Sequence, residues 1–176
     1  MLGSCSGYKW LTAGYGVGFL YVNRRHLHPE AFPAAGWRSA RIPYDMLSDR
    51  LDLSDNAAAL ELGHPPFASV FALGAALELF EAIGPEAVER RVFDLSAYGA
   101  ERIGALGHRV VTPTDEAHRA GITSVRIESP AELKRTLAED LGIHVSARGD
   151  VLRVSTHLFN DESDVDRLAA ALQRLR

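Results

Sequence analysis

The second half of the sequence most constrains the fold, because short apolar runs alternate there with helical patterns. Strands are predicted at residues 108–111, 122–127, 143–146 and 151–155, where the runs are short and rich in β-branched residues. Leucines at four-residue spacing predict a helix between the second and third of these strands, ended by Gly142. We therefore expect a compact α/β unit with a short, mainly antiparallel sheet covered by helices.

Two motifs predict where helices of this unit begin. The run Ser129-Pro130-Ala131-Glu132 has the form of a capping box with proline at the first helical position. A last helix is predicted to begin after Asn160 or Asp161, either of which can cap it. Its apolar residues recur at helical spacing and are expected to face inward; they are Val165, Leu168, Leu172 and Leu175.

The first 84 residues have a different pattern. The apolar run 17–22 predicts one strand buried on both faces, without a neighbouring strand. An apolar run over 67–83, ended by Gly84, predicts a largely buried helix, and Pro85 begins a second helix that extends to about Leu106. A lone buried strand and one apolar helix cannot cover each other. We therefore assign residues 1–84 to the end of a larger domain and residues 85–176 to a small C-terminal domain.

Composition excludes several classes of function. The net charge of −4, the pI near 6.0 and the scattered arginines give no basis for binding nucleic acid or an anionic membrane. Cys5 is the single cysteine, so neither an intrachain disulfide nor a cysteine-rich metal site can form, and no metal site is predicted. Without a signal peptide or a long apolar run, we expect a cytoplasmic protein.

Lysine is rare in this chain. Of the 19 lysine and arginine residues, only Lys9 and Lys134 are lysines. Arginine cannot lose its proton in a protein, whereas a lysine can become a neutral amine that attacks a carbonyl carbon. Lys9, between two aromatic residues, is therefore a candidate nucleophile, with an ordinary surface lysine as the alternative. Lys134 lies beside Arg135 on the polar side of the predicted helix, and we expect it to be exposed.

Two arginines near the last predicted strand are candidate carboxylate ligands. Arg153 lies in the middle of the apolar run 151–154, where a charge must face solvent at a sheet edge or be paired. Arg148 lies in the loop before this run and is the competing carboxylate ligand, with a surface charge as the alternative. A planar guanidinium can hold a carboxylate through two hydrogen bonds.

Three segments in this order resemble the class V aminotransferase group of fold-type I enzymes, which depend on pyridoxal 5′-phosphate (PLP). Residues 6–11 with the glycine-rich run that follows resemble the cofactor-lysine segment, in which the lysine forms a Schiff base with PLP. Residues 60–65 resemble the segment that reaches the cofactor phosphate of the partner subunit. Residues 152–168 are similar to the C-terminal arginine strand, whose arginine binds the substrate carboxylate.

The resemblance implies a role for each matched residue. Lys9 becomes the catalytic, cofactor-binding lysine, Gly63 and His64 cofactor ligands, and Arg153 the ligand of an amino-acid substrate. His64 stands where many members have threonine, and it either donates to the phosphate or caps the following helix. Trp10 and Tyr15 either line the substrate pocket or pack in the core. Many members also have histidine where this chain has Tyr8.

Absences narrow the expected reaction. In cysteine desulfurases, a loop between the last two strands carries the cysteine that forms the persulfide. Here residues 143–150 contain no cysteine and lead directly into the predicted strand 151–155, so an epimerase, lyase or transaminase is expected instead.

The resemblance also implies that the rest of the cofactor site lies in a preceding domain. We therefore expect the isolated chain to be inactive. The active enzyme is expected to be a homodimer or an association of this chain with a missing N-terminal half. The alternative is a non-catalytic α/β association module.

Overall fold

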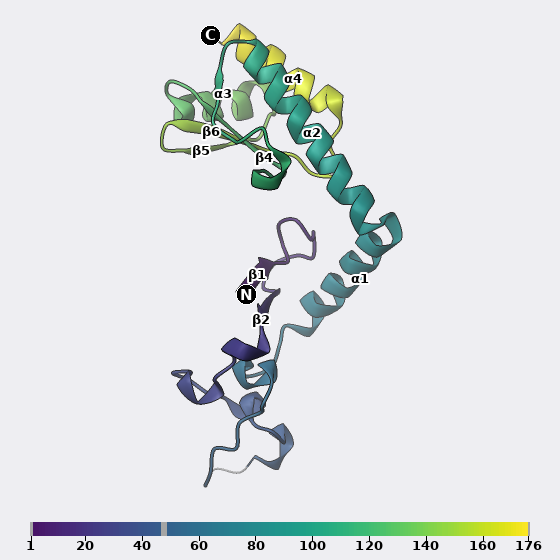
Figure 1. Cartoon of the computed structure of the whole chain (residues 1–176), viewed down its shortest axis with the longest axis vertical. Helices are drawn as coiled ribbons and strands as arrows, with labels where there is room; N and C mark the ends of the chain where they lie inside the picture. The colour runs from purple at the N-terminus through teal and green to yellow at the C-terminus, as the bar shows by residue number, and fades with distance from the viewer. Residues whose placement is uncertain (1, 47–48, 176) are drawn as a thin grey trace. The chain divides into compact units, whose positions relative to one another are not determined.

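A computed structural model describes residues 2–46 and 49–175 of the chain. Two compact units follow one another along the sequence, Met1–Ala82 and Ile83–Arg176, and Figure 1 draws them in successive colours from purple to yellow. The division lies beside the predicted domain boundary at residues 84 and 85. The assignment of the first unit to a large cofactor-binding domain stays a prediction.

The second unit contains the short antiparallel sheet that the sequence predicts. Its strands are β3 (Arg109–Val110), β4 (Ile122–Arg126), β5 (Ser146–Arg148) and β6 (Val151–Ser155). Their order across the sheet is β3-β4-β6-β5, and every neighbouring pair is antiparallel. The α/β fold class predicted from the alternating pattern is therefore confirmed.

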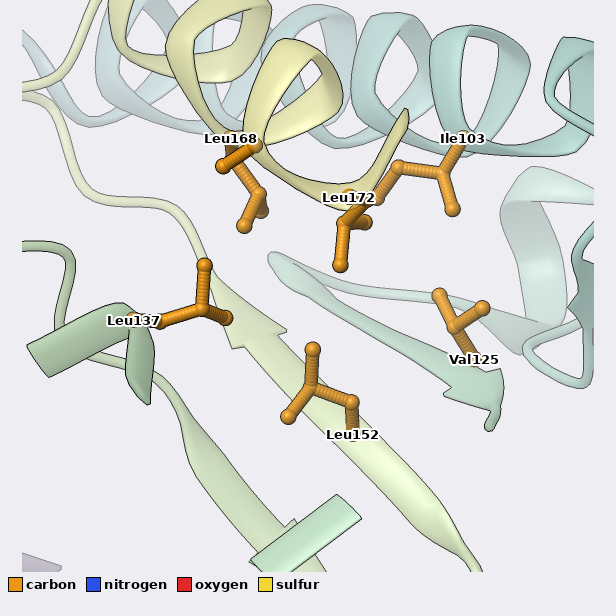
Figure 2. Close-up of a cluster of buried hydrophobic side chains, with 7 residues drawn as sticks. Ile103, Val125, Leu137, Leu152, Leu168 and Leu172 are labelled. Atoms are coloured by element: carbon orange, nitrogen blue, oxygen red, sulfur yellow. The ribbon is translucent and has the colours of Figure 1, made fainter. Parts of the chain in front are cut away.

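Three helices cover one face of this sheet (Figure 1). They are α2 (Pro85–Ala105), α3 (Pro130–Leu141) and α4 (Glu162–Arg174). The buried core lies between helices and sheet and consists of Ile103, Val125, Leu137, Leu152, Leu168, Ala171 and Leu172. Figure 2 shows the helical leucines and Ile103 pointing toward Val125 and Leu152 of the central strands. The apolar residues at helical spacing and those in the central strands thus form a single core.

The two predicted helix starts have different outcomes. Asp161 caps α4: its carboxylate accepts hydrogen bonds from the Ser163 and Asp164 amides, and Asp164 completes a capping box. The capping box predicted at Ser129 is wrong, because Ser129 has φ 51° and its side chain makes no capping hydrogen bond. An N-cap residue normally has extended backbone, and Ser129 does not, so Pro130 is the remaining signal for the start of α3.

The first unit begins with a two-stranded antiparallel hairpin, β1 (Leu2–Ser6) and β2 (Gly18–Val22). The prediction of a lone strand at residues 17–22 is therefore wrong, since Cys5 of β1 lies opposite Phe19 of β2. Small and polar residues in β1 carry no apolar pattern, yet their backbones pair as well as any others. Side chains of β2 are about half exposed in this chain, Phe19 at 49% and Leu20 at 54%.

Helix α1 (Phe67–Ile83) has the bounds predicted for it but not the burial. Only Ala76 is buried, whereas Phe67 is 56% and Phe71 is 77% exposed. The helix is apolar around most of its circumference, and one unit of this size cannot cover all of that surface. No single helix among the described residues is long and apolar enough to span a membrane; α1 and α2 meet that test only as a bent pair.

Short 3-10 helices connect the remaining segments. They are η1 (Arg24–His26), η2 (Pro29–Ala31), η3 (Trp37–Ser39), η4 (Pro43–Asp45), η5 (Ala57–Leu60) and, in the second unit, η6 (Glu116–His118). Two parts of the segment between β2 and α1 pack against each other. The backbone of Gly36 lies close to that of Leu62, and the Ser39 hydroxyl donates a hydrogen bond to the Glu61 carbonyl.

Candidate functional site

Lys9 lies in the loop that joins β1 to β2. Two backbone hydrogen bonds tie the base of this loop, from the Gly7 amide to the Val17 carbonyl at 2.8 Å and from the Ala13 amide to the Gly7 carbonyl at 2.9 Å. Gly7 is required there, because a Cβ atom would lie 2.8 Å from Val17 Cγ1. The loop therefore has a fixed base that presents an exposed lysine.

The backbone of the same loop holds an unusual conformation three residues after the lysine. Thr12 has φ 54°, and its amide donates to the Lys9 carbonyl at 3.2 Å. A β-branched residue rarely adopts a positive φ, and such strain is found mostly at functional loops. This strain supports a functional reading of the Lys9 loop.

One aromatic ring lies beside the Lys9 side chain. Its Nζ atom lies 5.5 Å from the centroid of the Tyr8 ring, and that ring stacks on Tyr15 at 5.1 Å between centroids. Within residues 2–46 and 49–175, no hydrogen bond or ion pair holds the Lys9 amine. An amine that is accessible and free of a carboxylate fits a role as the ligand of an aldehyde-bearing cofactor.

Trp10 and Tyr15 have different surroundings. Trp10 is partly buried, and its ring lies 6.2 Å from that of Phe80 in α1. Tyr15 is 82% exposed and contacts Tyr8. Packing thus accounts for Trp10, whereas the exposure of Tyr15 is compatible with a pocket wall. The lining role predicted for both stays a prediction.

Gly63 and His64 lie just before α1 in the first unit. The imidazole of His64 meets the Trp37 ring edge-on at 4.9 Å, and Phe67 lies 6.1 Å away. His64 is exposed, so its ring nitrogens are accessible to a phosphate. Its two predicted roles, phosphate contact and helix cap, both stay open.

Arg153 lies in the middle of β6, a central strand of the second sheet. It stands directly opposite Ser124 of β4 and Ser146 of β5. The side chain is partly buried, and its buried Nε atom has no hydrogen-bond partner among the described residues. An unsatisfied buried donor of this kind costs about 1–3 kcal/mol, more when the group is charged, so the site is suited to an acceptor that the described chain does not supply.

Arg148 ends β5 and is opposite Val151 of β6. Its predicted loop position is wrong, because β5 spans Ser146–Arg148 and not the predicted 143–146, and the hairpin turn consists of Gly149 and Asp150. Gly149 supplies the positive φ, 56°, that the tight turn needs. The Arg148 side chain is exposed, and no acidic residue pairs with it in the part of the chain that the structure describes.

The candidate residues form three groups. Lys9, Trp10 and Tyr15 share the β1–β2 loop, and Gly63 and His64 share a second segment of the first unit. Arg148 and Arg153 lie on neighbouring strands of the second unit. Ser124 and Ser146 could not be identified from the sequence, because cross-strand register leaves no local signal. In the sequence, Tyr8 stands out only as a departure from the family, and its stacking on Tyr15 is seen only in the structure. The described residues contain no cluster of three or more histidine, cysteine or acidic side chains able to hold a metal ion.

Comparison with known proteins identifies the family. The model of the aminotransferase class-V family matches residues 2–168, so the chain belongs to this family. Isopenicillin N epimerase of Amycolatopsis lactamdurans is 31% identical over 97% of this chain and 46% of its own length. Kynureninase of Myxococcus xanthus is 30% identical over 96% of this chain and 41% of its own length. The chain thus spans less than half the length of these curated relatives.

Solved structures share the fold. A cysteine desulfurase from Thermococcus onnurineus NA1 in its apo form matches with a TM-score of 0.82 and 21% identity, over 99% of this chain and 46% of its own. A mutant of C-DES, with glycine covalently linked to its PLP cofactor, matches with a TM-score of 0.80 and 22% identity, over 96% of this chain and 44% of its own. The resemblance to PLP enzymes inferred from the three segments is therefore confirmed at the level of family and fold.

Proposed function

We propose that this chain is the C-terminal portion of a PLP-dependent enzyme that acts on an amino-acid substrate, of epimerase, lyase or transaminase type. The observation that carries this proposal is the buried, unpartnered Nε atom of Arg153 in the middle of β6. A guanidinium at this position is matched by the carboxylate that every amino acid carries. The family assignment supports the proposal, because the resemblance implies that an arginine at this position binds the substrate carboxylate.

Each candidate residue has a physical role in this proposal. When bound, PLP supplies an electron sink for the carbanion that forms at the substrate Cα. Lys9 holds the cofactor through its amine and then moves the proton at Cα, for which a neutral amine at that position is suited. Arg153 fixes the substrate carboxylate, and Gly63 and His64 contact the cofactor phosphate. Tyr15 and Trp10 line the pocket beside the lysine.

Desulfurase chemistry is the least compatible reaction of the group. A persulfide carrier needs a thiol on a loop that can reach the substrate, but β5 and β6 are joined by Gly149 and Asp150 alone. Cys5, the single cysteine, lies in β1 and is partly buried. The structural similarity to desulfurases therefore concerns the fold and not this step.

The proposed enzyme needs residues beyond these 176, since the curated relatives are about twice as long. We propose that a homodimer, or association with an N-terminal half, completes the cofactor site. A cytoplasmic location is part of the same proposal, as PLP and amino acids are available there.

A second candidate function is a non-catalytic association module. The exposed apolar side chains favour it, with Phe71 of α1 at 77% and Tyr21 of β2 at 51% exposure. Apolar surface of this extent marks an interface that another polypeptide covers. In this reading Lys9 and Arg153 have no chemical role.

Titration of PLP into the chain separates the two candidates. We expect an absorbance change in the wild type and in Lys134→Ala, and its loss in Lys9→Ala, because only Lys9 lies in the glycine-anchored loop. Equal responses of both single variants would contradict the cofactor role of Lys9 and favour the module. Circular dichroism of each variant checks that the fold is retained.

A further inference from the structure

The face of the second sheet that the helices leave uncovered carries a set of arginines. Residues directly opposite one another in antiparallel strands point to the same face, and alternate residues point to opposite faces. Leu152 and Val125 point into the core. Arg153 and its two serine neighbours must therefore point to the other face, together with Arg126 and Arg148, each of which is paired with Val151.

Arg148 and Arg153 are diagonal neighbours on this face. Arg148 stands opposite Val151, two residues before Arg153 in β6. Diagonal positions in an antiparallel pair are about 7–8 Å apart between Cα atoms, which is within reach of two long side chains. One ligand with two separated anionic groups can therefore contact both guanidinium groups at once.

The charges of this face are only partly compensated. Arg126 pairs with Asp150, whose carboxylate lies 2.9 Å from its Nη1 atom. Arg148 and Arg153 have no acidic partner among residues 2–46 and 49–175. Two like charges at this separation repel each other, and a bound dianion would turn this repulsion into attraction. Arg109 of β3, directly opposite Arg126, shares this face and also has no acidic partner among the described residues. Of these three arginines, Arg148 and Arg153 lie on adjacent strands and are the pair that one ligand can contact.

Small residues flank Arg153 on both neighbouring strands. Both cross-strand neighbours, Ser124 and Ser146, are among the smallest polar residues. Neither serine hydroxyl accepts a hydrogen bond from the buried Nε atom of Arg153 in the described structure. The hydroxyl groups of these serines can donate to a carboxylate bound beside Arg153.

We propose that the substrate carries a second anionic group, so that Arg153 binds its α-carboxylate and Arg148 binds an anionic side chain. The inference rests on the proposed function and specifies the class of amino acid on which the enzyme acts. Arg148 is then a specificity-determining residue, because it contacts the part of the substrate that does not react.

L-Glutamate and L-glutamine test this proposal, since they differ in one charge and hardly in shape. Titration of each into the 176-residue chain at low ionic strength, followed by the NMR signals of the arginine Nε–H groups, gives both dissociation constants. We expect glutamate to bind about tenfold more tightly, because its side-chain carboxylate is attracted to the Arg148 guanidinium and the neutral amide of glutamine is not. At about 1 M salt this preference should largely disappear.

Three variants assign the effect. Arg148→Gln should reduce the glutamate preference to less than about twofold and leave glutamine binding unchanged, whereas Arg153→Gln should weaken both ligands about tenfold or more. Arg90→Gln is the matched control, because Arg90 is an exposed arginine of α2 with the same charge and no acidic partner among the described residues. It should change neither constant.

The outcomes separate this inference from the proposed function. Equal binding of the two ligands by the wild type, binding of neither, or an equal loss of both in Arg148→Gln would overturn the dianion site. An Arg153→Gln variant that binds glutamine normally would instead overturn the proposed role of Arg153. A loss of preference in Arg90→Gln would show that only net charge matters, and would also overturn the dianion site.

Discussion

Arg91 of α2 and Glu162 of α4 form a bidentate ion pair, with Nη1 to Oε1 at 2.7 Å and Nη2 to Oε2 at 3.2 Å. The same Nη2 atom donates to the Asn160 carbonyl at 3.1 Å. The pair therefore joins the middle of one helix to the start of another. Arg91 lowers the pKa of the Glu162 carboxyl below its ordinary value, mainly through the side-chain hydrogen bond.

This lowered pKa makes the second unit sensitive to acid. A carboxylate with a depressed pKa in the folded state contributes stability above its unfolded pKa, and the contribution is lost as the pH falls through the folded pKa. We expect Arg91→Met to destabilise the chain more at pH 7 than at pH values below about 4. Urea unfolding of both proteins at the two pH values measures the difference, and an equal effect at both would contradict the role of this ion pair.

The core between helices and sheet should dominate stability. Leu152 is fully buried in β6, and Leu152→Ala should cost about 2–5 kcal/mol of unfolding free energy through lost burial and a cavity. Leu175→Ala is the control, since Leu175 is 44% exposed and should cost less than about 1 kcal/mol. Urea unfolding followed by far-UV circular dichroism compares them, and similar losses would argue against the core in Figure 2.

Alanine substitution at two glycines of the first unit should change the stability of the protein in opposite directions. A Cβ atom on Gly36 would lie 1.8 Å from the Leu62 carbonyl oxygen, so Gly36→Ala must displace backbone and should destabilise by at least about 1–3 kcal/mol. At Gly74 in α1 nothing lies within 4 Å of an added Cβ, so Gly74→Ala should stabilise by about 0.5–1 kcal/mol. Tryptophan fluorescence reports on this unit, which contains both tryptophans, and a tolerated Gly36→Ala would contradict the close approach.

Helices were the part of the fold best predicted from the sequence. The bounds of α1 and α2 follow from an apolar run, two prolines and Gly84, all of which act within a few residues. The strand β1 was missed, because Gly3, Ser4 and Ser6 have no apolar alternation and pair only through a distant partner. The exposure of Phe71 was also unexpected, since local apolarity does not say how much surface the rest of a chain can cover.

Only part of the candidate site could be predicted from the sequence, because some of its residues come together only through the pairing of distant strands. Arg153 stands out because a charge in the middle of an apolar strand must face solvent at a sheet edge or be paired. β6 is a central strand and the buried Nε atom has no partner among the described residues, so the role of Arg153 as a carboxylate ligand stays a prediction. Its serine neighbours come from strands far apart in the sequence, so only the register of the sheet identifies them. The diagonal positions of Arg148 and Arg153 depend on the same register, and a one-residue shift of the hairpin would abolish this arrangement.

The most direct test of the account is the site at which PLP attaches to the chain. Reduction of the PLP-treated chain with borohydride, followed by peptide mass spectrometry, compares Lys9 with Lys134, the only two lysines in the sequence. We predict that the phosphopyridoxyl label is found predominantly on Lys9 and that Lys134→Ala leaves this labelling unchanged. Equal labelling of the two lysines, or a preference for Lys134, would contradict the assignment of Lys9 as the cofactor lysine.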